Sequence, residues 1–326
     1  SIEISVASID TDDEEKVSEE VETTLKETGD SNVKSRMRTA KSGNTVVVLD
    51  PGHGGSESGA VANGLVEKEL NLKIAQYCKN ELEEYRGVTV YMTRYNDTYV
   101  GLEERVAIAK SYGADFFVSI HNNSTTSASP NGAEVWYPNS SYNASVYNEG
   151  KALAEEIQSQ LVALGLGDRG VHYRNSESNT RYQDGSIADY YSVIKNSKLN
   201  GFPGIIVEHA FITNATDAAK LKSESFLQTL GKADATGIAN YLKISKVDYS
   251  PVFDFEYYIN RYADVKAAYS NDEEGALAHF INFGMKEKRQ GNAEFNVVSY
   301  KNRYQDLRKM YEDDYRQYYF HYIYFD

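Results

Sequence analysis

Short apolar runs that alternate with helical patterns constrain the fold of this chain more than any other feature. The runs are too short for helices and indicate buried strands, whereas the segments between them carry the apolar spacing of amphipathic helices. The predicted strands cover residues 46–49, 88–92, 116–120, 134–137 and 204–208, and the predicted helices cover residues 67–85, 102–112, 145–164 and 224–242. This alternation predicts an α/β domain over residues 44–245, in which helices cover both faces of a mostly parallel sheet.

Residues 1–43 differ sharply in composition from that domain. They form an acidic leader with charge runs at residues 12–15 and 19–22 and no aromatic residue. Such a segment cannot bury enough apolar surface to offset its conformational entropy. We therefore predict a disordered, solvated tether.

Residues 246–326 contain an internal repeat rich in tyrosine. Phe253 recurs as Phe295 and His279 as His321, which sets an offset of 42 residues (295 − 253) with no gap. A period in this range indicates a stacked supersecondary unit. Because the aromatic residues have helical spacing, we predict a small all-α region made of two helical hairpins.

Charge and cysteine content exclude several classes of function. The net charge of −14 argues against nucleic acid as a partner, because binding it needs clustered Lys and Arg. No apolar run approaches the roughly 18 residues of a membrane span, so none is expected. Cys78 is the single cysteine, which excludes an internal disulfide and a cysteine-based metal site. Its place in a helical apolar pattern indicates a small buried residue.

A glycine-rich turn with a histidine at its centre follows the first predicted strand. The run Asp50-Pro51-Gly52-His53-Gly54-Gly55 lets the backbone bend sharply and leaves the imidazole unshielded. A phosphate-binding loop is the alternative, but the run lacks the third glycine of a dinucleotide fingerprint, and no Gly-Lys-Ser/Thr follows. On this motif alone, the metal-ligand and other interpretations stay open.

Three further polar residues stand where strands end or helices begin. His121 follows the third predicted strand and Glu208 ends the last one, so both are expected at the carboxyl edge of the sheet together with His53. A carboxylate there is costly unless it meets a cation or a hydrogen-bond network, although a surface glutamate at a strand end is also common. Glu67 begins a helix, where the helix dipole alone favours an acid. Spacing does not separate Glu67 from Glu57 or Glu69 as a ligand.

Taken together, these motifs resemble the zinc-dependent N-acetylmuramoyl-L-alanine amidases. The resemblance covers residues 45–243, and the motifs follow the order and spacing of that family. The matching runs are Asp50 to Gly55, Glu67-Lys68 with Asn71-Leu72, Thr93-Arg94, Ser119 to Asn123, and Val207 to Asn214. As a set they are highly specific, whereas each piece alone is weak or moderate.

The resemblance implies a role for each matching residue. His53, Glu67 and His121 match the Zn²⁺ ligands, and Glu208 matches the catalytic glutamate. Two imidazoles and one carboxylate leave an open position for water, as in catalytic zinc sites. The implied reaction is hydrolysis, by a zinc-activated water, of the amide bond between the lactyl group of N-acetylmuramic acid and L-alanine of the peptidoglycan stem peptide. Glu208 would carry the proton from the water to the leaving nitrogen.

Four more residues are candidate substrate contacts or supports of the metal ligands: Asn123, Glu134, Arg94 and His209. Glu134 matches a position where the family keeps a glutamate near the metal. His209 stands beside Glu208, and neighbours in a strand point to opposite faces, so we predict that it is not a ligand. Arg94 is suited either to a substrate carboxylate or to a structural ion pair.

The resemblance further implies a secreted autolysin, associated with the cell wall, whose partner is peptidoglycan. We expect that any signal peptide was removed before the first residue of this chain. One alternative is a catalytically inactive peptidoglycan-binding protein, which would require the loss of a ligand or of Glu208, and none is lost. Another zinc amide hydrolase, such as a peptidase or deacetylase, is disfavoured because no His-Glu-x-x-His motif is present. The oligomeric state stays open.

The aromatic residues of the repeats allow two interpretations. They either fill the core of the repeats or form an exposed surface that stacks on glycan, and helical spacing favours the core for most of them. In the doublets Tyr257-Tyr258 and Tyr318-Tyr319, one ring of each pair should point away from a one-sided core. We predict a module that targets the wall or binds a protein.

Overall fold

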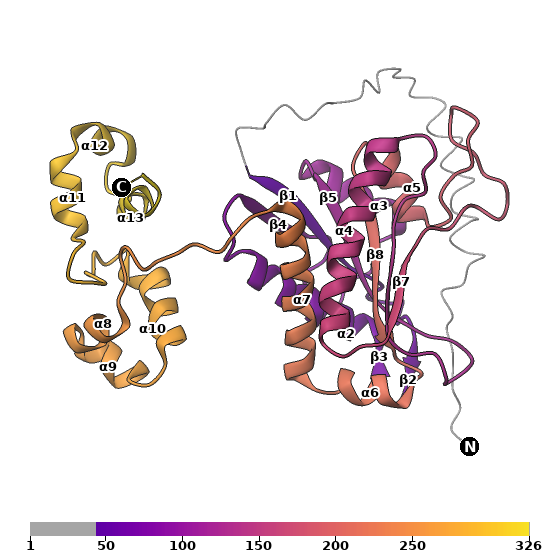
Figure 1. The fold of residues 1–326 in the computed structure, drawn as a ribbon, viewed down its shortest axis with the longest axis horizontal. Helices are drawn as coiled ribbons and strands as arrows, with labels where there is room; N and C mark the ends of the chain where they lie inside the picture. Colours follow the sequence, from indigo (N-terminus) through magenta and orange to yellow (C-terminus); the bar gives the residue numbers. More distant parts are fainter. Residues whose placement is uncertain (1–43, 326) are drawn as a thin grey trace. The chain divides into compact units, whose positions relative to one another are not determined.

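The computed structural model describes residues 44–325, so the predicted leader at residues 1–43 lies outside the described residues. The chain divides into two compact units, of which the first ends at Lys246 and the second comprises Val247–Asp326. Figure 1 shows the first unit as a sheet with helices and the second as a small helical array. In the described part of the chain, no helix is long and apolar enough to cross a bilayer.

The first unit contains a six-stranded sheet in the order β4-β1-β5-β8-β6-β7. Strands β4, β1, β5 and β8 are parallel, whereas β6 runs antiparallel to β8 and parallel to β7. The α/β fold with a mostly parallel sheet is therefore confirmed. The strands of this unit are β1 (Thr45–Pro51), β2 (Val61–Ala62), β3 (Leu65–Val66), β4 (Val88–Met92), β5 (Phe116–Asn123), β6 (Ala133–Trp136), β7 (Asp168–His172) and β8 (Gly204–Phe211).

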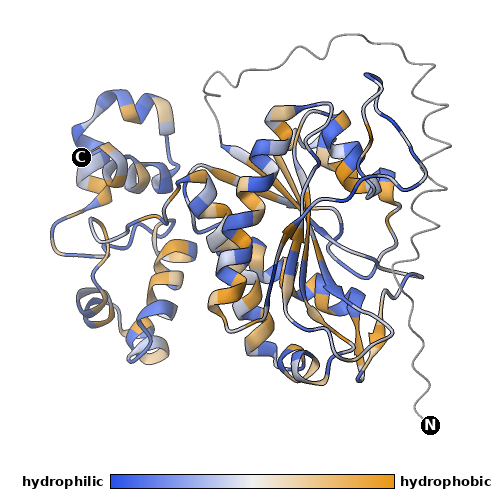
Figure 2. Cartoon of the chain, turned by 45° about the vertical axis from the view of Figure 1, so that its right-hand side comes forward, coloured by the Kyte–Doolittle hydropathy of each residue, from blue (hydrophilic) through white to orange (hydrophobic). Residues whose placement is uncertain are grey.

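Helices cover both faces of this sheet, as predicted. They are α2 (Glu67–Leu82), α3 (Leu102–Ser111), α4 (Ala144–Ala163), α5 (Ser192–Leu199), α6 (Ala215–Leu221) and α7 (Glu224–Leu242). Val47 and Leu49 of β1 belong to a core formed with α2, α4 and α7, whereas Val48 between them belongs to a core formed with α3 and α5. The strands read as continuous apolar runs because both faces are buried. Figure 2 shows the central strands largely in orange, the hydrophobic end of the scale.

Several short elements were not predicted from the sequence. They are the β2–β3 hairpin, the edge strand β7, and the helices α5 and α6. Strand β7 reads Asp-Arg-Gly-Val-His and is exposed or half-buried throughout, so it carries no apolar signal. Helices α5 and α6 have eight and seven residues, too few for a helical period to stand out.

The second unit is helical, as predicted, but each copy contains three helices, so the predicted hairpin of two helices is wrong. The helices are α8 (Phe255–Arg261), α9 (Ala263–Tyr269), α10 (Glu273–His279) continued by the π-helix η1 (Phe280–Gly284), α11 (Val297–Arg303), α12 (Gln305–Tyr311) and α13 (Tyr315–Phe325). Tyr262 and its counterpart Tyr304 are both extended, with φ of −122° and −110°, and separate the first helix of each copy from the second. Aromatic residues of both copies fill one common core.

The prediction for the tyrosine doublets holds in one copy and is wrong in the other. Tyr258 is buried and Tyr257 is half-buried, whereas Tyr318 and Tyr319 are both 0% exposed. The Tyr318 hydroxyl donates to backbone carbonyls of Leu307 and Glu312, and the Tyr319 hydroxyl donates to that of Arg289. Helix α13 is therefore covered on two sides, by α12 and by the end of the first copy.

Candidate functional site

The site begins with the turn after β1, where the backbone adopts conformations that suit glycine. Gly54 and Gly55 have φ of 130° and 58°, and His53 itself has φ of 60°. A non-glycine residue in this left-handed region is strained by roughly 1–3 kcal/mol, and such residues gather at functional sites. A Cβ atom at Gly52 would lie 2.1 Å from the ring of His121. Gly52 therefore allows the turn to approach β5 closely.

His53, Glu67 and His121 meet at this turn, as the sequence predicts. The Nε2 atom of His53 lies 3.4 Å from Oε2 of Glu67, and Nδ1 of His121 lies 3.0 Å from Oε1. One possible ligand atom of each residue lies within 4.8 Å of the others. The two imidazole rings stand nearly perpendicular, with centroids 5.0 Å apart. Three separate elements thus place two nitrogens and a carboxylate around one point.

Backbone and amide groups orient the Glu67 carboxylate. Its Oε2 accepts a hydrogen bond from the Ala60 amide at 2.8 Å, and its Oε1 accepts from the Asn122 amide at 3.2 Å and from Asn71 Nδ2 at 3.3 Å. Burial would raise the pKa of Glu67, but the charge of His53 and the hydrogen bond with His121 hold it well below its ordinary value. Glu67 is therefore an anion with a fixed orientation.

The two histidines respond differently to their surroundings. Burial is the largest influence on the pKa of His53, yet the Glu67 carboxylate outweighs it and raises the pKa. At His121 burial prevails and lowers the pKa, which favours the neutral imidazole that a metal needs. Within residues 44–325, the buried Nε2 atom of His53 makes no hydrogen bond. This buried nitrogen, 3.4 Å from the Glu67 carboxylate and near a second imidazole, fits a bound cation.

Glu208 lies beside the cluster on the neighbouring strand. It pairs in register with His121 on β5 and with Glu134 on β6. Residues in register on adjacent strands point to the same face and lie about 5 Å apart. His121, Glu208 and Glu134 therefore form a row across three strands, with Glu208 2% exposed at its centre.

Glu134 and Asn123 lie close to this row. Asn123 donates to Oε1 of Glu134 at 2.8 Å, and Arg169 of β7 donates to Oε2 at 2.7 Å. The guanidinium of Arg169 also covers the ring of Phe211 at 4.8 Å. The structure thus brings Glu134 and Asn123 next to Glu208, and their side chains already have partners.

His209 points to the opposite face of β8. Its Nδ1 is hydrogen-bonded to the His121 carbonyl at 2.9 Å, and its Nε2 lies 2.8 Å from Oδ2 of Asp234 on α7. Burial lowers its pKa, but the Asp234 carboxylate outweighs this effect and the net shift is upward. His209 therefore ties the backbone of His121 to α7 and does not face the His53–Glu67–His121 cluster.

Two arginines hold the turn around His53. Arg94 donates to the carbonyls of Pro51, Gly52, Lys68 and Asn96. Arg105 donates to the carbonyls of Pro51 and His53 and to the Asp50 carboxylate, and both members of this ion pair are buried. Arg94 is only 3% exposed, so its guanidinium serves the loop backbone.

Sequence reasoning missed several residues that support the site. Asn71 donates to the Gly52 carbonyl and accepts from Asn122, which connects α2 to the turn and to β5. Asp234 is far from His209 in sequence, and its only signal is an acid inside an apolar helical pattern. A buried acid of this kind needs a partner, but the sequence does not name it.

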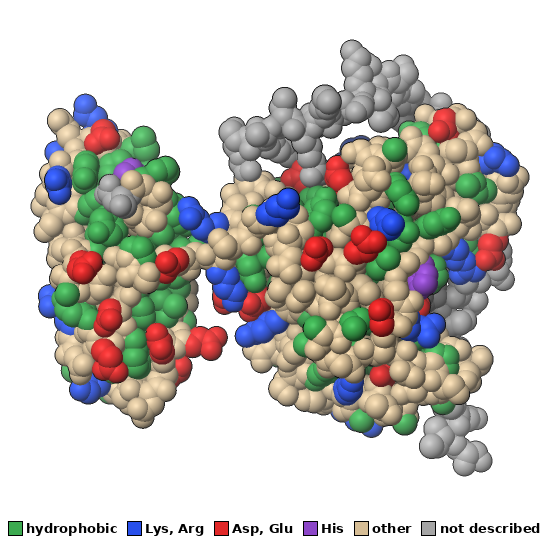
Figure 3. Space-filling model, in the orientation of Figure 1, with side chains coloured by type: hydrophobic (Ala, Val, Ile, Leu, Met, Phe, Trp, Pro, Cys, Tyr) green, Lys and Arg blue, Asp and Glu red, His purple; other side chains and the backbone are tan. Residues whose placement is uncertain are grey.

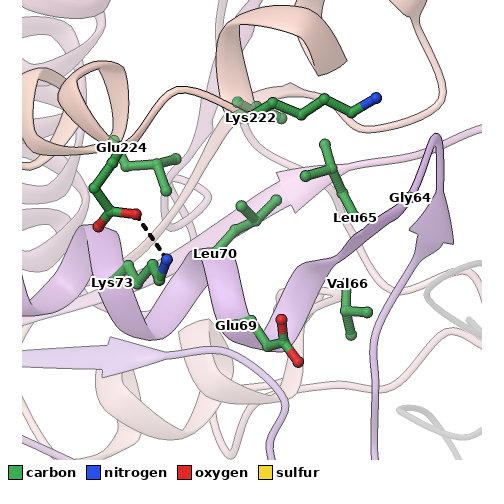
Figure 4. Close-up of a pocket in the computed structure, with 10 residues that line it drawn as sticks. Gly64, Leu65, Val66, Glu69, Leu70, Lys73, Lys222 and Glu224 are labelled. Atoms are coloured by element: carbon green, nitrogen blue, oxygen red, sulfur yellow. Dashed lines mark hydrogen bonds and ion pairs between the residues drawn. The ribbon is translucent and has the colours of Figure 1, made fainter.

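A separate hollow lies between α2, the β2–β3 hairpin and the segment that joins α6 to α7 (Figure 4). It has a volume of about 170 Å³ and is lined by Gly64, Leu65, Val66, Glu69, Leu70, Lys73, Leu221, Lys222, Glu224 and Leu227. Lys73 and Glu224 form an ion pair of 2.7 Å across it. None of the predicted site residues lines this hollow, so it is distinct from the His-Glu-His cluster.

The first unit is similar in sequence to a known protein family and to several of its members. Residues 47–240 match the family model described as N-acetylmuramoyl-L-alanine amidase. The amidase LytC of Bacillus subtilis is 41% identical over 212 residues, which cover 65% of this chain and 38% of LytC. The sporulation-specific N-acetylmuramoyl-L-alanine amidase of the same organism is 33% identical over 211 residues, which cover 64% of this chain and 72% of that protein. The chain thus spans well under half the length of LytC.

Solved structures give the same result. The catalytic domain of CwlV, an N-acetylmuramoyl-L-alanine amidase from Bacillus (Paenibacillus) polymyxa, is 32% identical with a TM-score of 0.51, and the match covers 62% of this chain and 99% of that one. The amidase AmiC2 of Nostoc punctiforme is 34% identical with a TM-score of 0.51, covering 62% and 98% respectively. The similarity therefore extends over about the length of the first unit.

Proposed function

This chain belongs to the N-acetylmuramoyl-L-alanine amidase family, and from that premise we propose that it hydrolyses peptidoglycan. The bond cut is the amide between the lactyl group of N-acetylmuramic acid and L-alanine of the stem peptide. The observation that carries the proposal is the meeting of His53, Glu67 and His121 beside Glu208. These side chains come from four elements and converge at the carboxyl edge of the sheet, where open α/β sheets place their sites.

The cofactor in this proposal is Zn²⁺, held by His53, Glu67 and His121. Two imidazoles and one carboxylate form a ligand set typical of catalytic zinc, and the unbonded Nε2 of His53 supports it. When bound, zinc would supply a Lewis acid that polarises the scissile carbonyl and lowers the pKa of water towards about 7. The fixed, ionised Glu67 and the neutral form favoured at His121 prepare the site for a cation.

Glu208 acts as the proton carrier in this scheme. Its carboxylate accepts a proton from the attacking water and delivers it to the alanine nitrogen as the C–N bond breaks. Its register with His121 supports this role, because it places the two side chains about 5 Å apart on one face. Burial keeps bulk water away from the carboxylate.

The remaining predicted residues receive different roles. Glu134 and Asn123 extend the row beyond Glu208, so we assign them to substrate contact or to the orientation of Glu208. Arg94 positions the turn that presents His53, and His209 positions the backbone of His121. These last two residues are positioning residues and touch no reacting atom.

The same proposal extends to the whole chain. In this proposal, residues 44–245 form the catalytic domain and residues 246–326 form a wall-targeting module. The protein works outside the cell as an autolysin of the cell wall. A relative from Staphylococcus aureus that is named a probable cell wall amidase, 33% identical over 200 residues, supports this location.

Product analysis tests the proposed reaction. The full chain is incubated with purified peptidoglycan, and the soluble products are analysed by mass spectrometry and for new reducing sugars. We expect intact stem peptides with a free L-alanine amino group and no new reducing ends, and no product after chelation or with His53→Ala. Cleavage inside the peptide, or new reducing sugar, would assign the enzyme to another class of hydrolase.

A further inference from the structure

We propose that each C-terminal repeat carries a glycan-binding site, centred on Phe283 in the first copy and on Phe325 in the second. The two residues occupy equivalent positions, because they differ by the repeat offset of 42 (325 − 283). They are 57% and 75% exposed. Among the described residues, they are the two phenylalanines whose side chains are exposed.

Both copies surround the exposed ring with the same partners. In the first copy, the ring of His279 lies 5.6 Å from Phe283 and 5.8 Å from Tyr269, and its Nδ1 is hydrogen-bonded to the Tyr258 hydroxyl at 3.1 Å. The histidine and Tyr269 are half-buried, whereas Tyr258 is buried. The buried tyrosine thus orients an imidazole that lies against the exposed ring.

The second copy reproduces this arrangement. His321 lies 5.0 Å from Phe325 and 6.3 Å from Tyr311, and its Nδ1 is hydrogen-bonded to the Tyr300 hydroxyl at 2.8 Å. The burial classes also agree, with a buried tyrosine, a half-buried histidine and an exposed phenylalanine. The two clusters therefore consist of equivalent residues with equivalent contacts.

Core packing does not account for the exposed rings. Tyr258 and Tyr300 belong to the buried core, so packing explains their recurrence. Phe283 and Phe325 are absent from that core and from the hydrophobic side chains packed against it. The second copy follows Phe283 in the chain and packs against the first copy through Phe280 and Tyr319, yet Phe283 remains exposed. Its exposure therefore does not come from a missing neighbouring repeat.

The chemistry of each cluster fits a sugar ring. A pyranose has a face of C–H groups, which stacks on an aromatic ring, and an edge of hydroxyl groups, which needs hydrogen-bonding partners. Each cluster offers an exposed phenylalanine beside an imidazole, which can donate or accept through the nitrogen that tyrosine does not use. Figure 3 shows hydrophobic side chains, with a histidine among them, on the visible face of this unit.

Two equivalent sites fit a ligand that itself repeats. A polymer of alternating amino sugars can occupy both sites at once, and linked sites of modest affinity then bind far more tightly than one. The identification of this polymer as the glycan of peptidoglycan rests on the proposed function. The two repeat clusters belong to the second unit, share no residue with the His53–Glu67–His121 cluster and do not depend on catalysis.

Titration with a peptide-free glycan tests the proposal. The full chain carrying Glu208→Gln, to prevent cleavage, is titrated calorimetrically with glycan strands freed of stem peptides. We expect Phe283→Ala or Phe325→Ala to weaken binding by about tenfold or more, because each removes one of two linked sites. The double variant should lose saturable binding, and replacement of both residues by Trp should preserve it. Met310→Ala is the matched control, since Met310 is 68% exposed but stands outside both clusters.

Two results would overturn the proposal. The first is unchanged glycan affinity in the double alanine variant with its helical circular dichroism intact. The second is a full chain that binds intact peptidoglycan through Phe283 and Phe325 but does not bind peptide-free glycan, because the ligand would then be the peptide. A chain that binds glycan but cuts no amide bond would refute the proposed function alone.

Discussion

Replacement of Gly52 by alanine should displace the proposed metal ligand His121, although Gly52 itself offers no side chain to a metal. An ideal Cβ atom at this position lies 2.1 Å from both Cε1 and Nε2 of His121, whereas ordinary contacts begin at 3.4 Å. The imidazole must therefore retreat by about 1.3 Å, the difference between these two distances. It has little freedom to do so, because Glu67 holds its Nδ1 and His209 holds its carbonyl.

The expected loss of activity follows from how little displacement of a ligand a metal site tolerates. Ligand distances in such sites vary by only about 0.2 Å, and a misplacement of about 1 Å near a reacting centre costs roughly 100-fold in rate. We expect Gly52→Ala to lose at least about 100-fold in amidase activity and to bind zinc more weakly. Overpacking should cost about 1–3 kcal/mol of stability.

The assay compares this variant with Gly101→Ala. Gly101 precedes α3 with φ of −65°, and nothing lies within 4 Å of a Cβ atom there. Both variants are measured for zinc content, for competition with a chelator and for product release from peptidoglycan. If Gly52→Ala keeps the zinc affinity and activity of the control, the geometric reasoning about this turn is wrong.

Further predictions concern stability. The pKa of His209 is raised above 6.5, so the stabilisation from Asp234 is fully present below about pH 6.5 and is lost as the pH rises through the raised pKa. In urea unfolding, the free energy of unfolding lost by Asp234→Asn should therefore become smaller as the pH rises. A loss that is the same at every pH would contradict the pairing of His209 with Asp234. Asp50→Ala leaves the buried Arg105 without its carboxylate and should cost about 3–5 kcal/mol of unfolding free energy; a loss under about 1 kcal/mol would refute this. Tyr319→Ala should cost about 3–5 kcal/mol in the second unit, seen as faster hydrogen exchange in α13, with zinc binding unchanged.

The fold of the first unit follows from local pattern to a large extent. The apolar runs of β1, β5 and β8 indicate strands buried on both faces, and the structure places Val47 and Val48 in opposite cores. The antiparallel direction of β6 was not predicted, because four residues contain no information about direction. Strand β7 was missed because it lies at the edge of the sheet, next to β6 alone, and its exposed or half-buried residues show no apolar run.

The part of the site that could be predicted from the sequence is the part where a histidine or glutamate stands at or just after the end of an apolar strand. His53 and His121 follow predicted strands and Glu208 ends another, so their common edge followed from the fold class. In the structure β5 and β8 extend beyond His121 and Glu208, to Asn123 and Phe211. Glu67 was not separable from Glu57 by spacing, and the resemblance to a family selected it. The structure shows a physical difference, because Glu67 is 2% exposed and contacts both histidines, whereas Glu57 is exposed.

Long-range partners were beyond sequence reasoning. The link from Asp234 through His209 to the carbonyl of His121 joins residues that lie far apart along the chain. The burial of both Tyr318 and Tyr319 contradicted a rule that assumes a one-sided core. Helix α13 breaks that rule because α12 and the first copy both contact it.

The most direct test of the account separates metal binding from proton transfer. Glu208→Gln keeps the size of the side chain but removes its ability to carry a proton, so zinc content and turnover on peptidoglycan are measured on the same preparation. We predict about one zinc per chain, as in the unmodified protein, with turnover lowered by roughly 10²–10⁴-fold. Loss of zinc would make Glu208 a ligand, and full turnover would remove it from the mechanism.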